Sequence, residues 1–279
     1  MAVMLKNELK RAFTSSGMLL AILLGQGINV YYIIDYLISY WEKKKSVAEV
    51  QKKIGHSLYM HVSRNTPFDL WITGHINQIT VLFLYFIPII AALPYAASYA
   101  REKKSGYVKN VTIRVGRIRY RVYKMIASFL SGGCAAASVS IVNLMWCFTR
   151  ISYKKPVITS SAPVAHGGTM FGVFYFSHPF IYVFTYILAT FIFAGGISLL
   201  SMIVSEITDN IFTVILSPFL IIMVLNVVMI DNMQFYLPVQ FLQASNSGLK
   251  LYMAPIFALI IIIISLWAVV FRNREKDVL

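Results

Sequence analysis

The chain has 279 residues, of which 58% are hydrophobic and only 13% are charged, and its mean hydropathy is +0.69. Soluble domains carry about 25% charged residues, so this composition excludes a soluble globular fold. The formal net charge is +14, but the basic residues lie in loops beside long apolar runs. That pattern is typical of cytoplasmic retention and contact with anionic lipid, and it argues against nucleic-acid binding.

Residues 1–16 are predicted to form an amphipathic helix at the membrane interface. One helical face carries the apolar residues and the other carries most of the polar and basic ones, namely Leu5, Leu9, Ala12 and Phe13 against Lys6, Asn7, Lys10 and Arg11. A frayed basic terminus is the alternative. The next apolar run lacks a small-x-small cleavage pattern, so we expect it to remain as the first span.

Six apolar runs have the length of about 20 residues that a membrane-spanning helix needs. They cover approximately residues 17–38, 79–100, 125–148, 180–204, 211–230 and 251–271. The sequence therefore predicts an all-α polytopic membrane protein, with one transmembrane domain over residues 1–279. Pro88 and Pro94 predict a kink or break in the second run. Small residues at 131–138 and 194–198 predict closely packed helix faces.

The connections between these runs differ in length and polarity. Residues 40–78 form a long polar loop, in which 46–62 could be an amphipathic surface helix, and 149–178 form a second polar loop. Residues 205–210 are predicted to be a short turn. Residues 231–250 are semi-polar and contain aromatics and a proline, which indicates a re-entrant or interfacial element before the last span.

The distribution of basic residues predicts that both termini face the cytoplasm. With the N-terminus inside, fifteen basic residues lie inside and ten lie outside, and the outside residues are spread over longer loops. The inside residues are Lys6, Lys10, Arg11, the nine of loop 101–124, Arg272, Arg274 and Lys276. The run of three lysines at 43–45 opposes this orientation but is outnumbered.

The chain shows no recognisable catalytic motif. It contains no GxxxxGK[ST], HExxH or GxSxG sequence and no paired carboxylates within the apolar runs, so we expect neither an enzyme nor a bound cofactor. The five histidines all lie in the two predicted outside loops with no compact metal-ligand spacing, which favours solvated side chains over a metal site or pH sensor; they are His56, His61, His75, His166 and His178. Cys134 and Cys147 would lie ~20 Å apart on one helix, so we expect free thiols.

The densest positive charge lies in one loop. Residues 99–124 contain nine basic residues and one acid, Glu102. A helix beginning near Val111 would place Arg114, Arg117 and Arg121 in one basic stripe. Such a helix could lie on anionic lipid or dock in a groove of a soluble partner. The simpler alternative is a topology signal without docking.

The same loop carries a resemblance to a known family. The loop contains Glu102-Lys103, then Gly106 with aliphatic or aromatic residues after it, then Arg114-Val115, and then Tyr120 and Lys124 at the entry to a span. This pattern resembles that of bacterial ABC type-2 permeases, the transmembrane subunits of one class of ABC exporter. The layout is similar over the whole chain: an amphipathic N-terminal helix, six spans, one long basic loop and a re-entrant element before the last span. A longer, more basic first outside loop, and "RVGR" in place of a proline-containing turn, depart from the pattern.

The resemblance implies a transport subunit, with no catalysis of its own, in the bacterial cytoplasmic membrane. Loop 101–124 would dock two copies of a separate P-loop ATPase, which would hold ATP and Mg²⁺, and a second permease, the same or related, would complete the exporter. The docking residues would be Arg101, Glu102, Lys103, Lys104, Gly106, Tyr107, Arg114 and Lys124. Spans rich in Phe, Tyr, Met and Ile with little fixed charge favour an amphipathic or hydrophobic cargo: a peptide, bacteriocin, drug or lipid-linked molecule. The alternative is a non-transporting membrane sensor or scaffold.

Overall fold

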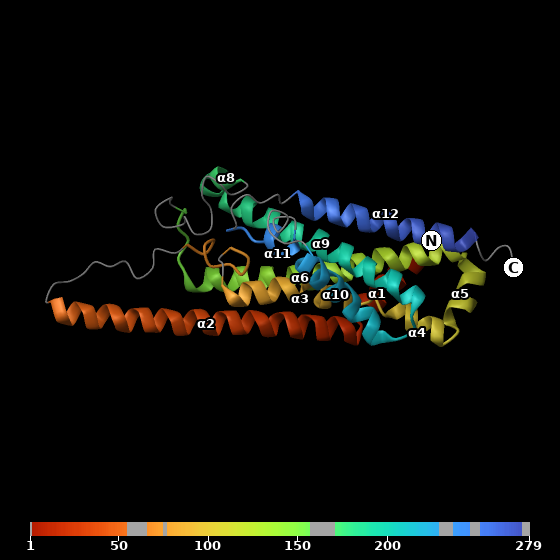
Figure 1. The fold of residues 1–279 in the computed structure, drawn as a ribbon, viewed down its shortest axis with the longest axis horizontal. Coiled ribbons are helices and arrows are strands. Elements are labelled where there is room, and N and C mark those ends of the chain that lie inside the picture. Colours follow the sequence, from red (N-terminus) through yellow and green to blue (C-terminus); the bar gives the residue numbers. More distant parts are fainter. Residues whose placement is uncertain are drawn as a thin grey trace.

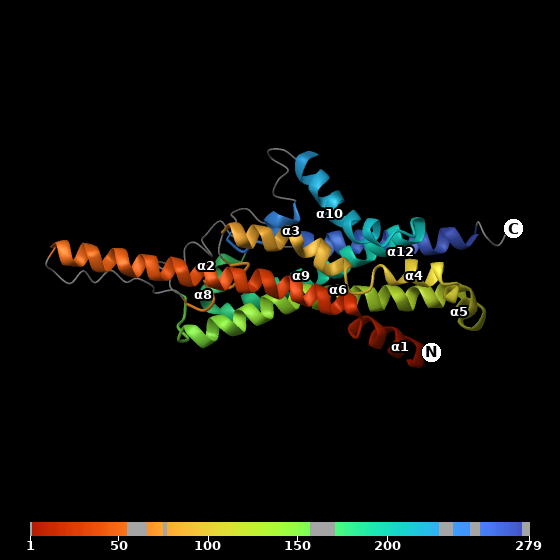
Figure 2. The same cartoon turned by 90° about the horizontal axis from the view of Figure 1, so that it is seen from below.

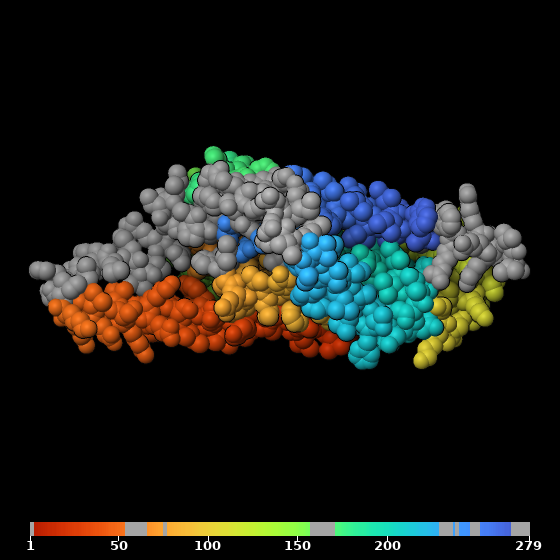
Figure 3. All heavy atoms as spheres, viewed as in Figure 1, coloured from red at the N-terminus to blue at the C-terminus, as the bar shows by residue number. Residues whose placement is uncertain are grey.

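The computed structural model describes residues 2–54, 66–74, 77–156, 171–228, 237–245 and 252–274. Within these ranges every regular element is a helix. The long helices lie along one axis and form an elongated bundle (Figures 1 and 2), and their side chains pack into a continuous body in the space-filling view (Figure 3). The predicted all-α fold class is confirmed for this part of the chain.

Each of the six apolar runs contains a long helix in the described part of the chain. The helices are α2 (Ser16–Ile54), α3 (Gln78–Ala92), α6 (Arg117–Arg150), α9 (Pro179–Ile207), α10 (Ile211–Val228) and α12 (Met253–Arg274). Among the described residues, α2, α6, α9 and α10 contain stretches long and apolar enough to cross a membrane, whereas α3 and α12 provide shorter apolar segments. Four candidate spans are therefore present, and six crossings remain a prediction.

Five short helices complete the described structure: α1 (Ala2–Phe13), α4 (Ser98–Lys104), α5 (Tyr107–Val115), α8 (Gly172–Ser177) and α11 (Pro238–Phe241). One end of the bundle gathers α1, α4, α5, the start of α6 and the end of α12 (Figures 1 and 2). We call it the basic end, because most of the predicted basic loop lies there. The opposite end holds α8, α11 and residues 66–74.

The second apolar run is broken, as its prolines predict. Helix α3 ends at Ala92, residues 93–97 form turns, and α4 begins at Ser98. Proline removes a backbone donor and clashes with the preceding turn, so Pro94 lies in the break. Pro88 is accommodated inside α3. The break turns α4 away from α3, which allows α4 to reach α6 and α1.

The small-residue stretches pack helices together as predicted. The hydroxyls of Ser128 on α6 and Ser198 on α9 lie 2.7 Å apart. A Cβ atom built on Gly132 would lie 2.6 Å from the carbonyl oxygen of Ala91, and one on Gly195 would lie 2.7 Å from the Phe129 ring. Such distances are closer than van der Waals contact, so only glycine lets α6 approach α3 and α9 this closely. Cys134 and Cys147 are free thiols, also as predicted.

Several loop predictions require correction or lie outside the described residues. Residues 46–54 continue α2, so a separate surface helix does not begin there; residues 55–62 lie outside the described part. The turn predicted at 205–210 is confirmed in position but is shorter, with α9 ending at Ile207 and α10 beginning at Ile211. Of the predicted re-entrant element only 237–245 is described; it contains α11, and its Ala244 N–H donates to the Thr73 carbonyl at 3.0 Å.

Residues 66–74, predicted to be part of a polar loop, are buried without exception. Asp69 holds this segment together: its carboxylate accepts hydrogen bonds from the N–H and hydroxyl of Thr66 at 2.7 and 2.8 Å and from the Tyr175 hydroxyl on α8 at 2.6 Å. Burial and the neighbouring Asp69 charge raise the pKa of Tyr175, so its hydroxyl remains a donor. The segment is therefore an internal plug rather than a solvated loop.

A chain of amides joins this plug to the long helices. The side-chain oxygen of Asn143 on α6 accepts from the Ile72 N–H at 2.8 Å, and its amide nitrogen donates to Asn29 on α2 at 2.8 Å. Asn29 in turn donates to Gln26 at 3.0 Å. Buried polar groups cost free energy unless they are hydrogen-bonded. Gln26 and Asn29 of the first span are thus hydrogen-bonded inside the bundle.

Candidate functional site

Four charged side chains from three helices meet inside the basic end. Glu102 on α4 lies 2.9 Å from the Lys124 ammonium on α6 and 2.6 Å from the Arg11 guanidinium on α1. Glu8, also on α1, lies 3.3 Å from Arg11 and 3.7 Å from Lys124. Two carboxylates thus balance two cations. We call these four residues, with their hydrogen-bonding neighbours Tyr95, Ser98 and Tyr120, the ion cluster.

Three of the four charged side chains are withdrawn from solvent, whereas the Arg11 side chain is 46% exposed. Glu8, Glu102 and Lys124 are only 3%, 6% and 1% exposed. Charges this deeply buried persist only when paired and hydrogen-bonded, because desolvation costs several kcal/mol per ion. The four charges therefore hold α1, α4 and α6 together.

Hydroxyl groups supply the remaining bonds of the ion cluster. The Tyr120 hydroxyl donates to Glu102, and the Tyr95 hydroxyl donates to Glu8. The Lys124 ammonium donates to the Ser98 hydroxyl at 2.8 Å and lies 4.5 Å from the centre of the Tyr95 ring, which adds a cation–π contact. Burial and the bond to Glu8 raise the pKa of Tyr95, so it remains a neutral donor.

Two further ion pairs connect the neighbouring helices. Arg121 on α6 and Glu206 on α9 lie 3.5 Å apart, and both are buried. Lys103 on α4 and Asp209, in the turn after α9, lie 2.9 Å apart at the surface. The buried Arg121–Glu206 pair contributes to the link between α6 and α9, whereas an exposed pair such as Lys103–Asp209 contributes about 1 kcal/mol or less.

Helices α4 and α5, joined at Gly106, form an exposed elbow. Gly106 has φ +75° and Gly116 has φ +88°, a backbone conformation that favours glycine. Between them, none of the residues of α5 is buried. Helix α5 therefore projects from the basic end, with a glycine turn at each of its ends.

The structure separates the predicted docking residues into two groups. Arg101, Lys103, Lys104, Tyr107 and Arg114 are exposed on the elbow, with Gly106 at its bend. Glu102 and Lys124 face inward and belong to the ion cluster. Only the first group is available to a soluble partner; the second fixes how the elbow is attached to the bundle.

One prediction about this loop is wrong. A single helix from Val111 through Arg121 does not exist, because the chain breaks at Gly116 between α5 and α6. Arg121 is buried beside Glu206, with its guanidinium 6.0 Å from the centre of the Tyr99 ring. The basic stripe is therefore divided, and Arg121 has an internal role.

The sequence did not predict several of these buried partners. Glu8 lies in a segment predicted to be basic and interfacial, and Tyr95 lies in an apolar run. Glu206, the partner of Arg121, lies in the segment predicted to be a short turn. The one available signal was compositional: the chain has only eleven acidic residues against twenty-five basic ones, and an acid in a basic, apolar segment needs a partner. The identity of that partner depends on which helices are neighbours.

No metal centre is evident in the described part of the chain, where no three His, Cys, Asp or Glu side chains group closely enough to hold an ion. His178 lies at the start of α9, its ring 5.1 Å from that of Phe174. The other four histidines lie outside the described residues.

Comparisons with protein-family models, with characterised proteins and with solved structures gave no match to this chain.

Proposed function

We propose that this chain is the permease subunit of an ABC exporter, working with a separate ATPase in the bacterial cytoplasmic membrane. The observation that supports this most strongly is the combination of an exposed basic elbow with a buried ion cluster at its root. A loop whose only role is to set the orientation of the protein in the membrane needs positive charge. It does not need a defined bend or buried ion pairs at its base.

The attachment of the elbow suggests how a movement of the elbow would be transmitted to the membrane helices. A helix exposed on a mobile surface can dock in a groove of a partner. Glu102 is on α4, inside the elbow, and pairs with α1 and α6 at once. Breaking a buried ion pair is costly, so α1, α4 and α6 would move as one unit when a partner displaced the elbow. Since α6 packs on α9 through small residues and the Arg121–Glu206 pair, the movement would extend into the bundle.

The proposal includes partners that this chain does not supply. Two ATPase subunits would hold ATP and Mg²⁺, since the sequence contains no GxxxxGK[ST] motif. A second permease, the same or related, would complete the exporter. Both termini would lie in the cytoplasm, with the basic end inward, and the six apolar helices would provide the crossings. The apolar bundle favours an amphipathic or hydrophobic cargo such as a peptide, a bacteriocin, a drug or a lipid-linked molecule.

Co-purification tests the docking step with variants that spare the ion cluster. We expect the tagged chain, expressed with its neighbouring genes and extracted in mild detergent, to retain a P-loop ATPase. The triple variant Arg101→Gln, Lys104→Gln, Arg114→Gln should retain at least tenfold less, because it removes three exposed charges from the elbow. The matched control, Lys43→Gln, Lys44→Gln, Lys45→Gln, removes three exposed charges from α2 near the opposite end and should behave as the wild type.

The same experiment distinguishes the alternative. When the variants are expressed without the neighbouring genes, equal protein amounts and elution volumes on gel filtration equal to those of the wild type show that both are folded. If no ATPase accompanies the wild-type chain, the docking proposal fails, and a non-transporting sensor or scaffold whose elbow binds lipid becomes the better interpretation.

A further inference from the structure

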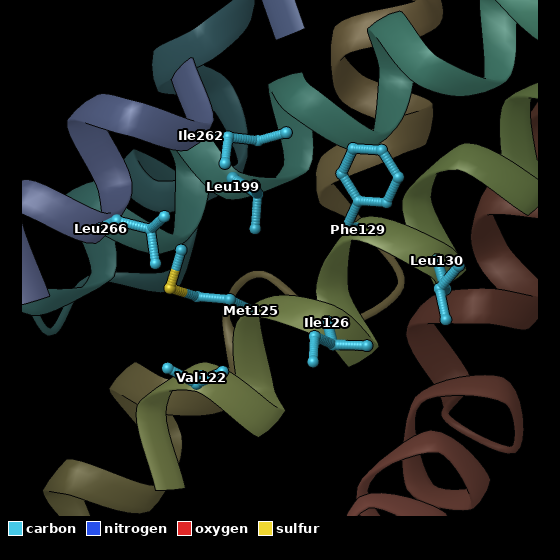
Figure 4. A pocket seen from close by; sticks show the side chains of 8 residues that line it. All are labelled: Val122, Met125, Ile126, Phe129, Leu130, Leu199, Ile262 and Leu266. Carbon is cyan, nitrogen blue, oxygen red and sulfur yellow. The ribbon is translucent and has the colours of Figure 1, made fainter. Parts of the chain in front are cut away.

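An apolar groove opens between α6, α9 and α12, on the side of the bundle away from α1. Its volume is about 250 Å³. Figure 4 shows the lining side chains converging from the three helices on one space. They are Val122, Met125, Ile126, Phe129, Leu130, Leu199, Ile262 and Leu266, and all eight are apolar.

The size and the lining of the groove suit a single hydrocarbon chain. Pockets that enclose drug-sized ligands are usually ~300–1,000 Å³ and contain a few polar groups that orient the ligand. This groove is smaller and offers no such group along its length. Val122 and Leu130 lie eight positions apart on α6, or about 12 Å along the helix, so the groove is elongated along the helix.

Hydrocarbon contact alone gives such a groove little selectivity in a bilayer, because lipid tails are as apolar as the groove itself. Selectivity must come from the headgroup at the end of the groove. Arg119 is exposed and lies one turn before Val122, on the same face of α6. Across the groove, α12 continues beyond Leu266 to Arg274.

One described acid, Glu206, borders this region, and it is already paired. Glu206 borders a small gap next to the groove, which also touches Met125 and Leu199. Its carboxylate lies 3.5 Å from the Arg121 guanidinium, so this pair is close to neutral. The mouth of the groove at the basic end therefore combines an apolar channel with the exposed cation Arg119.

We infer that this groove binds one anionic phospholipid, with an acyl chain along α6 and the phosphate at Arg119. Basic residues near a membrane surface each attract anionic lipid by about 1 kcal/mol, which corresponds to roughly a fivefold preference. The bound lipid would contact the same turns of α6 that carry Arg121 and Lys124. This inference concerns lipid binding and does not depend on an ATPase partner.

Native mass spectrometry of the purified chain tests the inference directly. The protein is equilibrated in detergent with equal amounts of dioleoyl phosphatidylglycerol and dioleoyl phosphatidylcholine, and the retained lipids are counted. We expect one phosphatidylglycerol per chain, retained about fivefold or more in preference to phosphatidylcholine. Arg119→Gln should reduce that preference about fivefold, and Arg119→Lys should keep most of it. Arg114→Gln, on the elbow, should match the wild type.

A second variant tests the groove separately from the headgroup contact. Ile126→Trp fills the groove from a position that is 37% exposed, so it should fold and lose the retained lipid of either kind. Leu220→Trp, on the exposed face of α10 (56% exposed), is the matched control and should retain it. Equal retention of the two lipids by the wild type would overturn the inference. Undiminished lipid retention by Ile126→Trp would overturn it as well. If an uncharged apolar peptide displaces the bound lipid and Arg119→Gln does not change the lipid preference, the groove would be assigned to apolar cargo instead.

Discussion

Replacing Lys124 with methionine is expected to lower the free energy of unfolding by about 3–5 kcal/mol. The substitution preserves much of the side-chain volume but leaves Glu8 and Glu102 buried with only Arg11 as a cation. Removing one partner of a buried ion cluster leaves uncompensated charge, which is why the effect is large. Reversible denaturation of the detergent-solubilised chain measures the change.

Two comparisons isolate the ion cluster in that experiment. Lys104→Met changes an exposed lysine on the same elbow and should change stability by less than about 0.5 kcal/mol. The double variant Glu102→Gln, Lys124→Met removes one charge of each sign and should be more stable than Lys124→Met alone. A loss at Lys124 no larger than that at Lys104 would show that the four charges do not lock the helices.

Replacing Asp69 with alanine is expected to destabilise the opposite end by about 2–5 kcal/mol. The carboxylate accepts three hydrogen bonds, and its removal leaves the Thr66 N–H and the Tyr175 hydroxyl buried without their acceptor; each such group costs about 1–3 kcal/mol. Residues 66–74 should then open more often, so limited proteolysis followed by peptide mapping should show new cleavage within them.

The control for the plug is Glu49→Ala, an exposed acid on α2. It should leave both the stability and the cleavage pattern unchanged. Asp69→Asn keeps one side-chain carbonyl as an acceptor and should fall between the wild type and alanine. Protection of residues 66–74 in Asp69→Ala equal to that in the wild type would contradict the role assigned to this carboxylate.

Local sequence signals predicted the helices well. Each apolar run contains a helix, as its length and hydrophobicity predict. The second run is divided into α3 and α4 at Pro94, which lacks a backbone donor. The small residues around Gly132 and Gly195 correctly indicated close packing. These features depend on a residue and its immediate neighbours, which the sequence displays directly.

The features that sequence reasoning missed depend on distant partners. Residues 66–74 read as a polar loop because Asp69 and Thr66 are polar, yet they bond to each other and to Tyr175 inside the bundle. Glu8 and Lys124 are far apart in sequence, so their pairing appears only once α1 packs on α6. Gly116 could have suggested the break before α6, but a lone glycine is tolerated in many helices, so the break needed the structure to establish it.

Site-directed photo-crosslinking tests the central claim, that the elbow docks a separate ATPase, most directly. A photoreactive amino acid is placed at position 104 or 114 on the exposed elbow, or at position 44 on α2 as the control, and the chain is expressed with its neighbouring genes. We predict that the first two positions give a covalent adduct with a P-loop ATPase and that position 44 does not. No ATPase adduct from either elbow position, or an equal adduct from position 44, would contradict the assignment of the elbow as a docking surface.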